Sequence, residues 1–275
     1  MLIHGLISAI SNATRPLGLG LLASRGVGRA LFVGLIGVIL AGCAGLQPSE
    51  DPGLIARAPL LRDSSGAALL LTRTPADRTY PAGWEPWILH PAKNRTRYVT
   101  GAAGDEAVIR AHAQAAASGL ARPLALDPTS VPIIEWRWRI DSLINGADNT
   151  DRYAEDSPVR IVLAFDGDKR SLPVRDQLFF EQARFLSGGR EMPYATLMYI
   201  WENQQPVNTI LQNPHTGRVR KIVVASGASG VGSWQQYRRN IVEDYREAFG
   251  QEPGRLIGVA ILTDTDNTKE TVSAQ

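Results

Sequence analysis

The sequence predicts a β-sandwich of antiparallel strands with one or two α-helices packed beside it. Short apolar segments recur between residues 108 and 263, and several of them alternate with polar residues. Gly, Pro and Asp lie between these segments. Period-two strands separated by turn residues are typical of antiparallel sandwiches. Only two stretches of the chain show helical spacing instead.

The clearest strand is expected at residues 133–140. Its isoleucines and tryptophans alternate with charged residues, which predicts one buried face and one face in water. Trp136 and Trp138 share their face with isoleucines, so core packing is favoured over a platform for sugar binding. Further strands are expected at 108–113, 159–165, 197–201, 219–224 and 256–263.

Two helices are expected between the strands. The stronger begins after Ser233, a favourable N-cap residue, and ends at Gly250. The weaker covers residues 174–186 and ends at a pair of glycines. Apolar residues of the stronger helix recur at helical spacing, at Trp234, Tyr237, Ile241, Tyr245, Ala248 and Phe249.

Residues 1–42 have the layout of a bacterial signal peptide. They contain three arginines and no acidic residue, and an apolar run at 30–40 leads to small residues before Cys43. The sequence Leu-Ala-Gly-Cys at 40–43 resembles a lipobox, in which the cysteine is lipidated and becomes the new N-terminus. The apolar run is shorter than the roughly 20 residues that a membrane span needs. We therefore expect a lipoprotein anchored through Cys43.

The remaining chain is expected to contain one domain. Residues 43–79 are rich in small, polar and proline residues and are interpreted as a tether and lead-in segment, and 80–275 as the β-sandwich. Cys43 is the only cysteine, so no intramolecular disulfide is expected. Residue 44 is alanine and not the aspartate that favours retention at the inner membrane. This favours the outer membrane, with the domain facing the periplasm.

Charge and histidine content argue against a nucleic-acid partner and against a zinc site. Removal of residues 1–42 takes away three of the 29 basic residues and none of the 27 acidic ones, which leaves a net charge near −1. This balance does not suggest nucleic-acid binding. The three histidines that follow form no His-x-x-x-His or Glu-x-x-His pair, so a zinc site is not expected.

The candidate ligand-binding residues are Trp201, Glu202 and Arg160. Trp201 closes a predicted strand beside Glu202, which favours a position at the rim of the domain, where an exposed tryptophan ring suits the apolar face of a sugar. A catalytic carboxylate pair is an alternative, but nothing in the sequence selects two of the many carboxylates. No catalytic residue is therefore assigned.

The segment 264–268 has the most distinctive chemistry. Asp264, Asp266 and Asn267 follow a predicted strand and could converge on a hard cation such as calcium. The segment lacks the central glycine and terminal glutamate of an EF-hand loop. An arginine such as Arg160 or Arg239, or backbone N–H groups of a turn, would also neutralise the two carboxylates, and these alternatives are favoured over the metal.

Several motifs in one order carry a resemblance to a known family. They are Ile134-Glu135-Trp136-Arg137-Trp138, Asp156-Ser157-Pro158-Val159-Arg160, Phe165-Asp166-Gly167-Asp168, Ala195-Thr196-Leu197-Met198-Tyr199-Ile200-Trp201, Arg239-Asn240-Ile241-Val242-Glu243-Asp244-Tyr245 and Leu262-Thr263-Asp264-Thr265-Asp266-Asn267-Thr268. From about residue 81 to 275 the chain resembles the exported bacterial domain of unknown function, family 3047. The resemblance implies a jelly-roll, galactose-binding-like β-sandwich and no established activity. It also implies a further short strand after the Asp-Asn-Thr segment, which we expect this chain to lack.

Three classes of function remain open. The leading hypothesis is a non-catalytic module of the cell envelope that binds a carbohydrate or another envelope polymer. The first alternative is a hydrolase or lyase that acts on envelope glycans through a carboxylate pair. The second is a structural lipoprotein that binds other envelope proteins.

Overall fold

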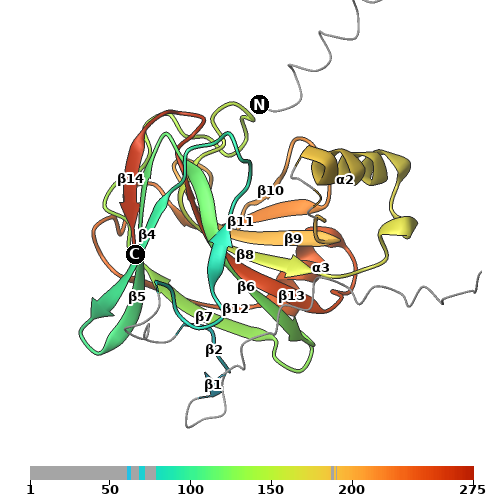
Figure 1. Ribbon diagram of the computed structural model, residues 1–275, viewed down its shortest axis with the longest axis horizontal. Coiled ribbons are helices and arrows are strands. Elements are labelled where there is room, and N and C mark those ends of the chain that lie inside the picture. The colour runs from blue at the N-terminus through green and yellow to red at the C-terminus, as the bar shows by residue number, and fades with distance from the viewer. Residues whose placement is uncertain (1–60, 63–67, 72–78, 187–188, 190) are drawn as a thin grey trace, which may run out of the picture. The chain divides into compact units, whose positions relative to one another are not determined.

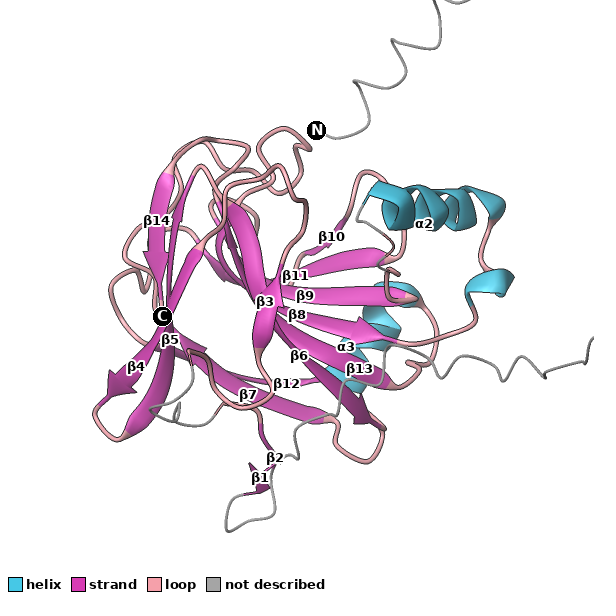
Figure 2. Cartoon of the chain, viewed as in Figure 1, coloured by secondary structure: helices cyan, strands magenta, loops and turns pink. Residues whose placement is uncertain are grey.

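The computed structural model describes residues 61–62, 68–71, 79–186, 189 and 191–275 (Figures 1 and 2). The predicted signal peptide at 1–42, Cys43 and most of the predicted tether at 43–79 lie outside the described residues. Within the described part, no helix has both the length and the apolar character that a membrane span requires.

A seven-stranded sheet forms the first layer of the domain. Its central strand β8 pairs with β9 on one side and with β13 on the other. Adjacent strands of this sheet run antiparallel, except that β9 and β11 run parallel to each other. In spatial order the strands are β10 (Ile210–Gln212), β11 (Val219–Ser226), β9 (Ala195–Glu202), β8 (Ser157–Phe165), β13 (Leu256–Asp264), β6 (Ala117–Leu126) and β3 (Glu85–Trp87).

Two smaller sheets and a helix face this layer. One sheet pairs β7 (Ile133–Trp138) with β12 (Gln235–Asn240). The other has the order β14 (Thr271–Ala274), β5 (Glu106–Gln114), β4 (Arg97–Ala103). Helix α3 (Ile241–Phe249) follows β12 directly. The remaining elements are β1 (Leu61–Arg62), β2 (Ala68–Leu69), the short 3₁₀ helix η1 (Lys169–Ser171) and α2 (Val174–Leu186).

The main core lies between the two layers. Leu163, Tyr199 and Ile222 of the large sheet share it with Trp138 of β7 and Tyr245 of α3. Trp136 packs against the same core from β7. The predicted alternation of 133–138 is confirmed, since Trp138 is buried while Glu135 and Arg137 are exposed. Trp136 and Trp138 therefore belong to the packing between the layers.

The β-sandwich is confirmed, but the expectation of a purely antiparallel arrangement is wrong at β9 and β11. The two strands run in the same direction because the chain returns from β9 through the short edge strand β10, which pairs antiparallel with β11. Periodicity alone reports the faces of a strand and not the direction of its neighbour.

The weaker helix is confirmed and the stronger one is shorter than predicted. α2 covers Val174–Leu186 as expected. Residues 235–240, expected to be helical, form β12, in which Tyr237 lies opposite Trp136. The helix begins at Ile241, where the Asn240 side chain accepts hydrogen bonds from the backbone N–H groups of the first turn. Gly250 ends it with a φ of 68°, as predicted.

The expected loss of a C-terminal strand is wrong. After the Asp-Asn-Thr segment the chain forms β14, which pairs antiparallel with β5. Val272 and Ala274 of β14 are buried, and Ile140 forms a bridge to Ala274. The edge of β5 is therefore paired with this strand.

Candidate functional site

Charged side chains are buried on the outer face of the large sheet, away from the main core. β8 is buried on both faces because this outer face is also covered. The loop before β8 and the segments after β9 and β13 meet there. We name these side chains the buried charged cluster: Asp156, Arg160, Glu202, Lys221 and Asp264, together with the partly buried Glu155.

Arg160 and Asp264 form the centre of the buried charged cluster. Arg160 is 2% exposed, and its Nε and Nη2 donate to the two oxygens of Asp264 at 3.1 and 2.9 Å. This two-point geometry is the strong form of an arginine–carboxylate pair. Burial raises the pKa of Asp264 to about 6, and Arg160 opposes that rise. Arg160 thus neutralises Asp264. This is the arginine pairing that the sequence favoured over a metal ion.

Lys221 is the second buried cation of the cluster, and sequence reasoning missed it. Its Nζ lies 2.7 Å from Oε1 of Glu155 and 3.2 Å from Oδ1 of Asn149. Burial lowers the pKa of Lys221 to about 8. In the sequence, Lys221 stands beside Arg220 in the otherwise apolar strand 219–224, and a charge that is buried there must find a partner.

The predicted rim position of Trp201 and Glu202 is wrong. Trp201 is 0% exposed in the main core, where its Nε1 donates to the carbonyl of Gly227. Glu202 is 1% exposed and accepts hydrogen bonds from the backbone N–H groups of Asn149 and Gln205. The two side chains lie on opposite faces of β9, and both are buried because both faces of this strand are covered. Together with Arg160, these side chains hold loops on the sheet and offer no exposed surface.

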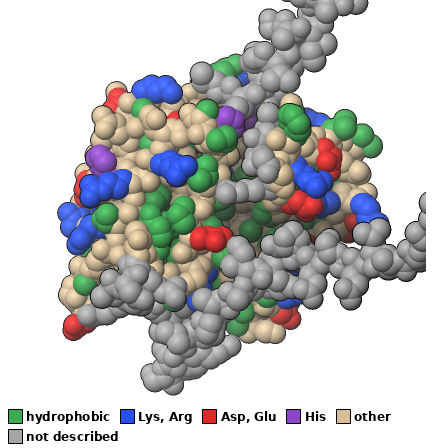
Figure 3. Space-filling model, viewed as in Figure 1, with side chains coloured by type: hydrophobic (Ala, Val, Ile, Leu, Met, Phe, Trp, Pro, Cys, Tyr) green, Lys and Arg blue, Asp and Glu red, His purple; other side chains and the backbone are tan. Residues whose placement is uncertain are grey.

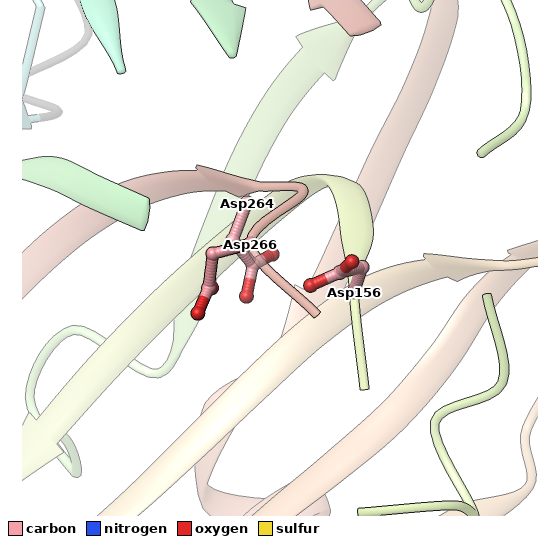
Figure 4. A group of neighbouring side chains, drawn as sticks. All are labelled: Asp156, Asp264 and Asp266. Atoms are coloured by element: carbon pink, nitrogen blue, oxygen red, sulfur yellow. The ribbon is translucent and has the colours of Figure 1, made fainter. Parts of the chain in front are cut away.

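The predicted metal ligands gather only in part. Oxygens of Asp264, Asp266 and Asp156 lie within 4.8 Å of one another, with Asp156 facing the turn after β13 (Figure 4). Asn267 enters through its backbone N–H, which donates to Asp156 at 3.2 Å. Asp266 lies 2.6 Å from Nζ of Lys93. Each of the three carboxylates therefore already has a donor from the protein, and calcium stays a prediction from sequence.

We expect calcium to leave the melting temperature unchanged. Because the three carboxylates already accept hydrogen bonds or ion pairs from protein donors, Asp264→Asn should lower the free energy of unfolding by about 2 kcal/mol in calcium and in chelator alike. Calorimetry of both proteins in the two conditions measures this. A calcium-dependent rise in wild type that disappears in Asp264→Asn would instead establish a metal site.

An open groove lies on a different part of the domain. It has a volume of about 660 Å³ and runs between β12, α3 and the edge formed by β10 and β11. We name it the polar groove, lined by Ile133, Asn208, Ile210, Ile222, Arg238, Arg239, Asn240, Glu243, Asp244 and Glu247. Its volume is that of an ordinary small-molecule site.

Side chains fixed by their neighbours form one wall of the polar groove. Asp244 accepts hydrogen bonds from the Tyr199 hydroxyl at 2.6 Å and from Nε of Arg239 at 2.9 Å. Nη1 of Arg239 donates to Oδ1 of Asn208 at 3.2 Å. Burial, together with Asp244, raises the pKa of the Tyr199 phenol, which stays protonated as a donor. The wall is thus oriented before any ligand arrives.

The polar groove combines donors with acceptors. Two arginines and three carboxylates line it, so its formal charge is −1. Ile133, Ile210 and Ile222 add apolar surface. Sequence reasoning missed the groove because its residues come from separate segments, although the motif at 239–245 contains four of them.

Comparison with known families places the domain. The profile described as "Protein of unknown function (DUF3047)" matches residues 82–275. The chain belongs to the DUF3047 family. The matched DUF3047 region contains the buried charged cluster and the polar groove. No curated protein matches the chain.

Proposed function

We propose that this DUF3047 protein is a binding module of the bacterial cell envelope, tethered to a membrane through Cys43. Its ligand is a neutral carbohydrate of an envelope polymer, and the polar groove receives it. The pre-oriented wall of Asn208, Arg239 and Asp244 carries this proposal. Such a wall suits a ligand whose hydroxyl groups both donate and accept.

The charge of the polar groove favours a neutral ligand over an acidic one. Glu243 and Glu247 are exposed on α3, one turn apart, and would repel an anionic polymer. A polyol can accept from Arg238 and donate to these carboxylates. The apolar surface of Ile133 and Ile210 offers contact for the C–H face of a sugar ring.

Binding measurements with defined oligosaccharides test this proposal. Calorimetry would use hexasaccharides of glucose in α-1,4 and in β-1,4 linkage and of N-acetylglucosamine. We expect one of them to bind, and Arg238→Ala combined with Asn208→Gly to weaken that binding at least about tenfold. Glycine tolerates the φ of 68° at position 208, so the change removes the amide without straining the backbone.

Arg246→Ala supplies the matched control. Arg246 lies on α3 with Glu243 and Glu247, but it pairs with Glu252 and does not line the polar groove. Its removal should leave affinity unchanged. Equal affinity of wild type and the groove variant would contradict the assignment. Analysis of the bound oligosaccharides for new reducing ends or unsaturated products separates binding from the hydrolase or lyase alternative.

Lipidation of Cys43 is a separate expected result. Cys43→Ser should leave an unprocessed precursor, because the lipobox cysteine accepts the lipid before cleavage. Two or three acyl chains anchor a protein stably, whereas one holds it only marginally. Gel mobility measures whether the precursor is processed, and detergent partitioning measures whether the protein carries a lipid anchor. A Cys43→Ser protein of mature size that still partitions into detergent would rule out the lipobox.

A further inference from the structure

A second concave surface, on the sheet β14–β5–β4, has the opposite charge character. Tyr98, Ile109 and Ala111 fill the inner face of this sheet and join the main core. The outer face carries Arg97 and, on the neighbouring strand, Arg110 and His112. Basic side chains and a histidine gather over these strands at the left of the view (Figure 3).

A pocket of about 360 Å³ opens on that outer face. Arg97 lies directly opposite His112 in the pairing of β4 and β5, and Arg110 precedes His112 by two residues on the same face. Arg139 joins them because its backbone exchanges two hydrogen bonds with Gln275. We name this the basic pocket, lined by Arg97, Arg110, His112 and Arg139 together with Asp141.

The arginines of the basic pocket lack the close carboxylates that other arginines have. Asp141 is the one carboxylate side chain in its lining and lies 3.9 Å from Arg139, the edge of ion-pair range. Within the described residues, Arg97 and Arg110 have no carboxylate within 4.0 Å. By contrast, Arg238 and Arg246 each lie within 2.9 Å of a glutamate.

One donor of the basic pocket is also buried without a partner. Nε of Arg139 is covered and makes no hydrogen bond with the described residues. A buried donor without an acceptor costs free energy, and Arg97 and Arg110, at diagonal positions of neighbouring strands, repel one another. An anion held between the arginines would relieve the repulsion.

We propose that the basic pocket binds a phosphate group. Guanidinium groups donate two parallel hydrogen bonds to phosphate oxygens, and three arginines converge here from separate strands and their ends. The phosphate belongs to a free phosphate or to a lipid headgroup. This site is independent of the polar groove, so either assignment can fail alone.

Thermal melting of the full chain in inorganic phosphate tests the proposal, with sodium chloride of equal ionic strength as the reference. Phosphate should raise the melting temperature of wild type, and Arg97→Gln combined with Arg110→Gln should weaken phosphate binding at least about tenfold. Without phosphate the double variant should melt at or above the wild-type temperature, because its removal of like charges relieves repulsion. This second readout separates lost binding from lost folding.

Arg246→Gln is the matched control, an exposed arginine outside the basic pocket, and should bind phosphate as wild type does. Equal phosphate shifts in wild type and the double variant, or no shift in wild type, would overturn the proposal. Sedimentation with phosphatidylglycerol and phosphatidylcholine vesicles identifies the source. It compares Cys43→Ser with Cys43→Ser that also carries the two arginine changes, so that any binding by the retained segment 1–42 is common to both proteins. Retention on phosphatidylglycerol that depends on Arg97 and Arg110 supports a lipid headgroup. Phosphate binding without retention supports a free phosphate.

Discussion

Replacing Arg160 with methionine is expected to lower the free energy of unfolding by about 3–5 kcal/mol. The methionine fills part of the volume but leaves the Asp264 carboxylate buried without its cation. Glu155 also loses a neighbouring cation, because Nη1 of Arg160 lies 3.9 Å from its carboxylate. Chemical denaturation of wild type and Arg160→Met measures the loss.

The cost of Arg160→Met should depend on pH. The pKa of Asp264 is about 6 in the fold and about 3.9 in the unfolded chain, so the folded state favours its protonated form. This contribution to stability is complete below pH 4 and is lost as pH rises through 6. Without Arg160 the carboxylate is harder to ionise, so the variant should lose more stability at pH 8 than at pH 5.

A double-mutant cycle checks that the effect belongs to the pair. Arg160→Met combined with Asp264→Asn removes both charges, so its cost should be smaller than the sum of the two single costs. Additive costs, or a loss for Arg160→Met that is equal at pH 5 and pH 8, would show that the pair does not control stability here.

Trp138→Ala is expected to cost about 3–5 kcal/mol, because it opens a cavity in the main core. Trp138 is 2% exposed and lies between the two layers. Its ring is 5.1 Å from that of Tyr237 and 5.6 Å from that of Trp136. Thermal and chemical denaturation both report the change.

Trp234→Ala is the control for tryptophan removal. Trp234 is only partly buried and lies outside the main core, and the guanidinium of Arg137 lies 4.5 Å from its ring centroid. Loss of that contact should cost about 1 kcal/mol or less. If Trp138→Ala melts like Trp234→Ala while losing oligosaccharide binding, Trp138 is a ligand residue and not a core residue.

Strands with clear alternation could be predicted from the sequence, and strands without it could not. The segment 133–138 shows its buried face directly, whereas β6 consists largely of small residues with no alternation. Gly119 of β6 explains part of that composition. A Cβ atom there would lie 2.5 Å from the carbonyl oxygen of Ile261 and 2.9 Å from the ring of Trp87. Neighbouring strands approach β6 too closely for a larger side chain at this position, and small residues show no alternation of apolar and polar side chains.

The start of the stronger helix was missed for a different reason. Trp234, Tyr237 and Ile241 follow helical spacing, but Tyr237 reaches the core from a strand and Ile241 from a helix. Tertiary pairing with β7 overrides the local pattern. Asn240, an equally good cap, marks where the helix begins.

The candidate site was predictable only where a charge interrupts an apolar strand. Arg160 between Val159 and Ile161 indicated a buried partner, and Asp264 was one of the carboxylates that called for an arginine. The polar groove left no comparable signal. Asn208, Arg239 and Glu247 come together only because β12, α3 and the β10–β11 edge meet in the fold.

Nuclear magnetic resonance titration with the oligosaccharide that binds best tests the central claim most directly. Backbone amide signals report where the ligand sits without altering any side chain. The largest shifts are expected at Asn208, Arg239 and Glu247, which line the polar groove. Saturable shifts confined to residues outside the groove, or no shifts with any of the hexasaccharides, would contradict the assignment of a carbohydrate site there.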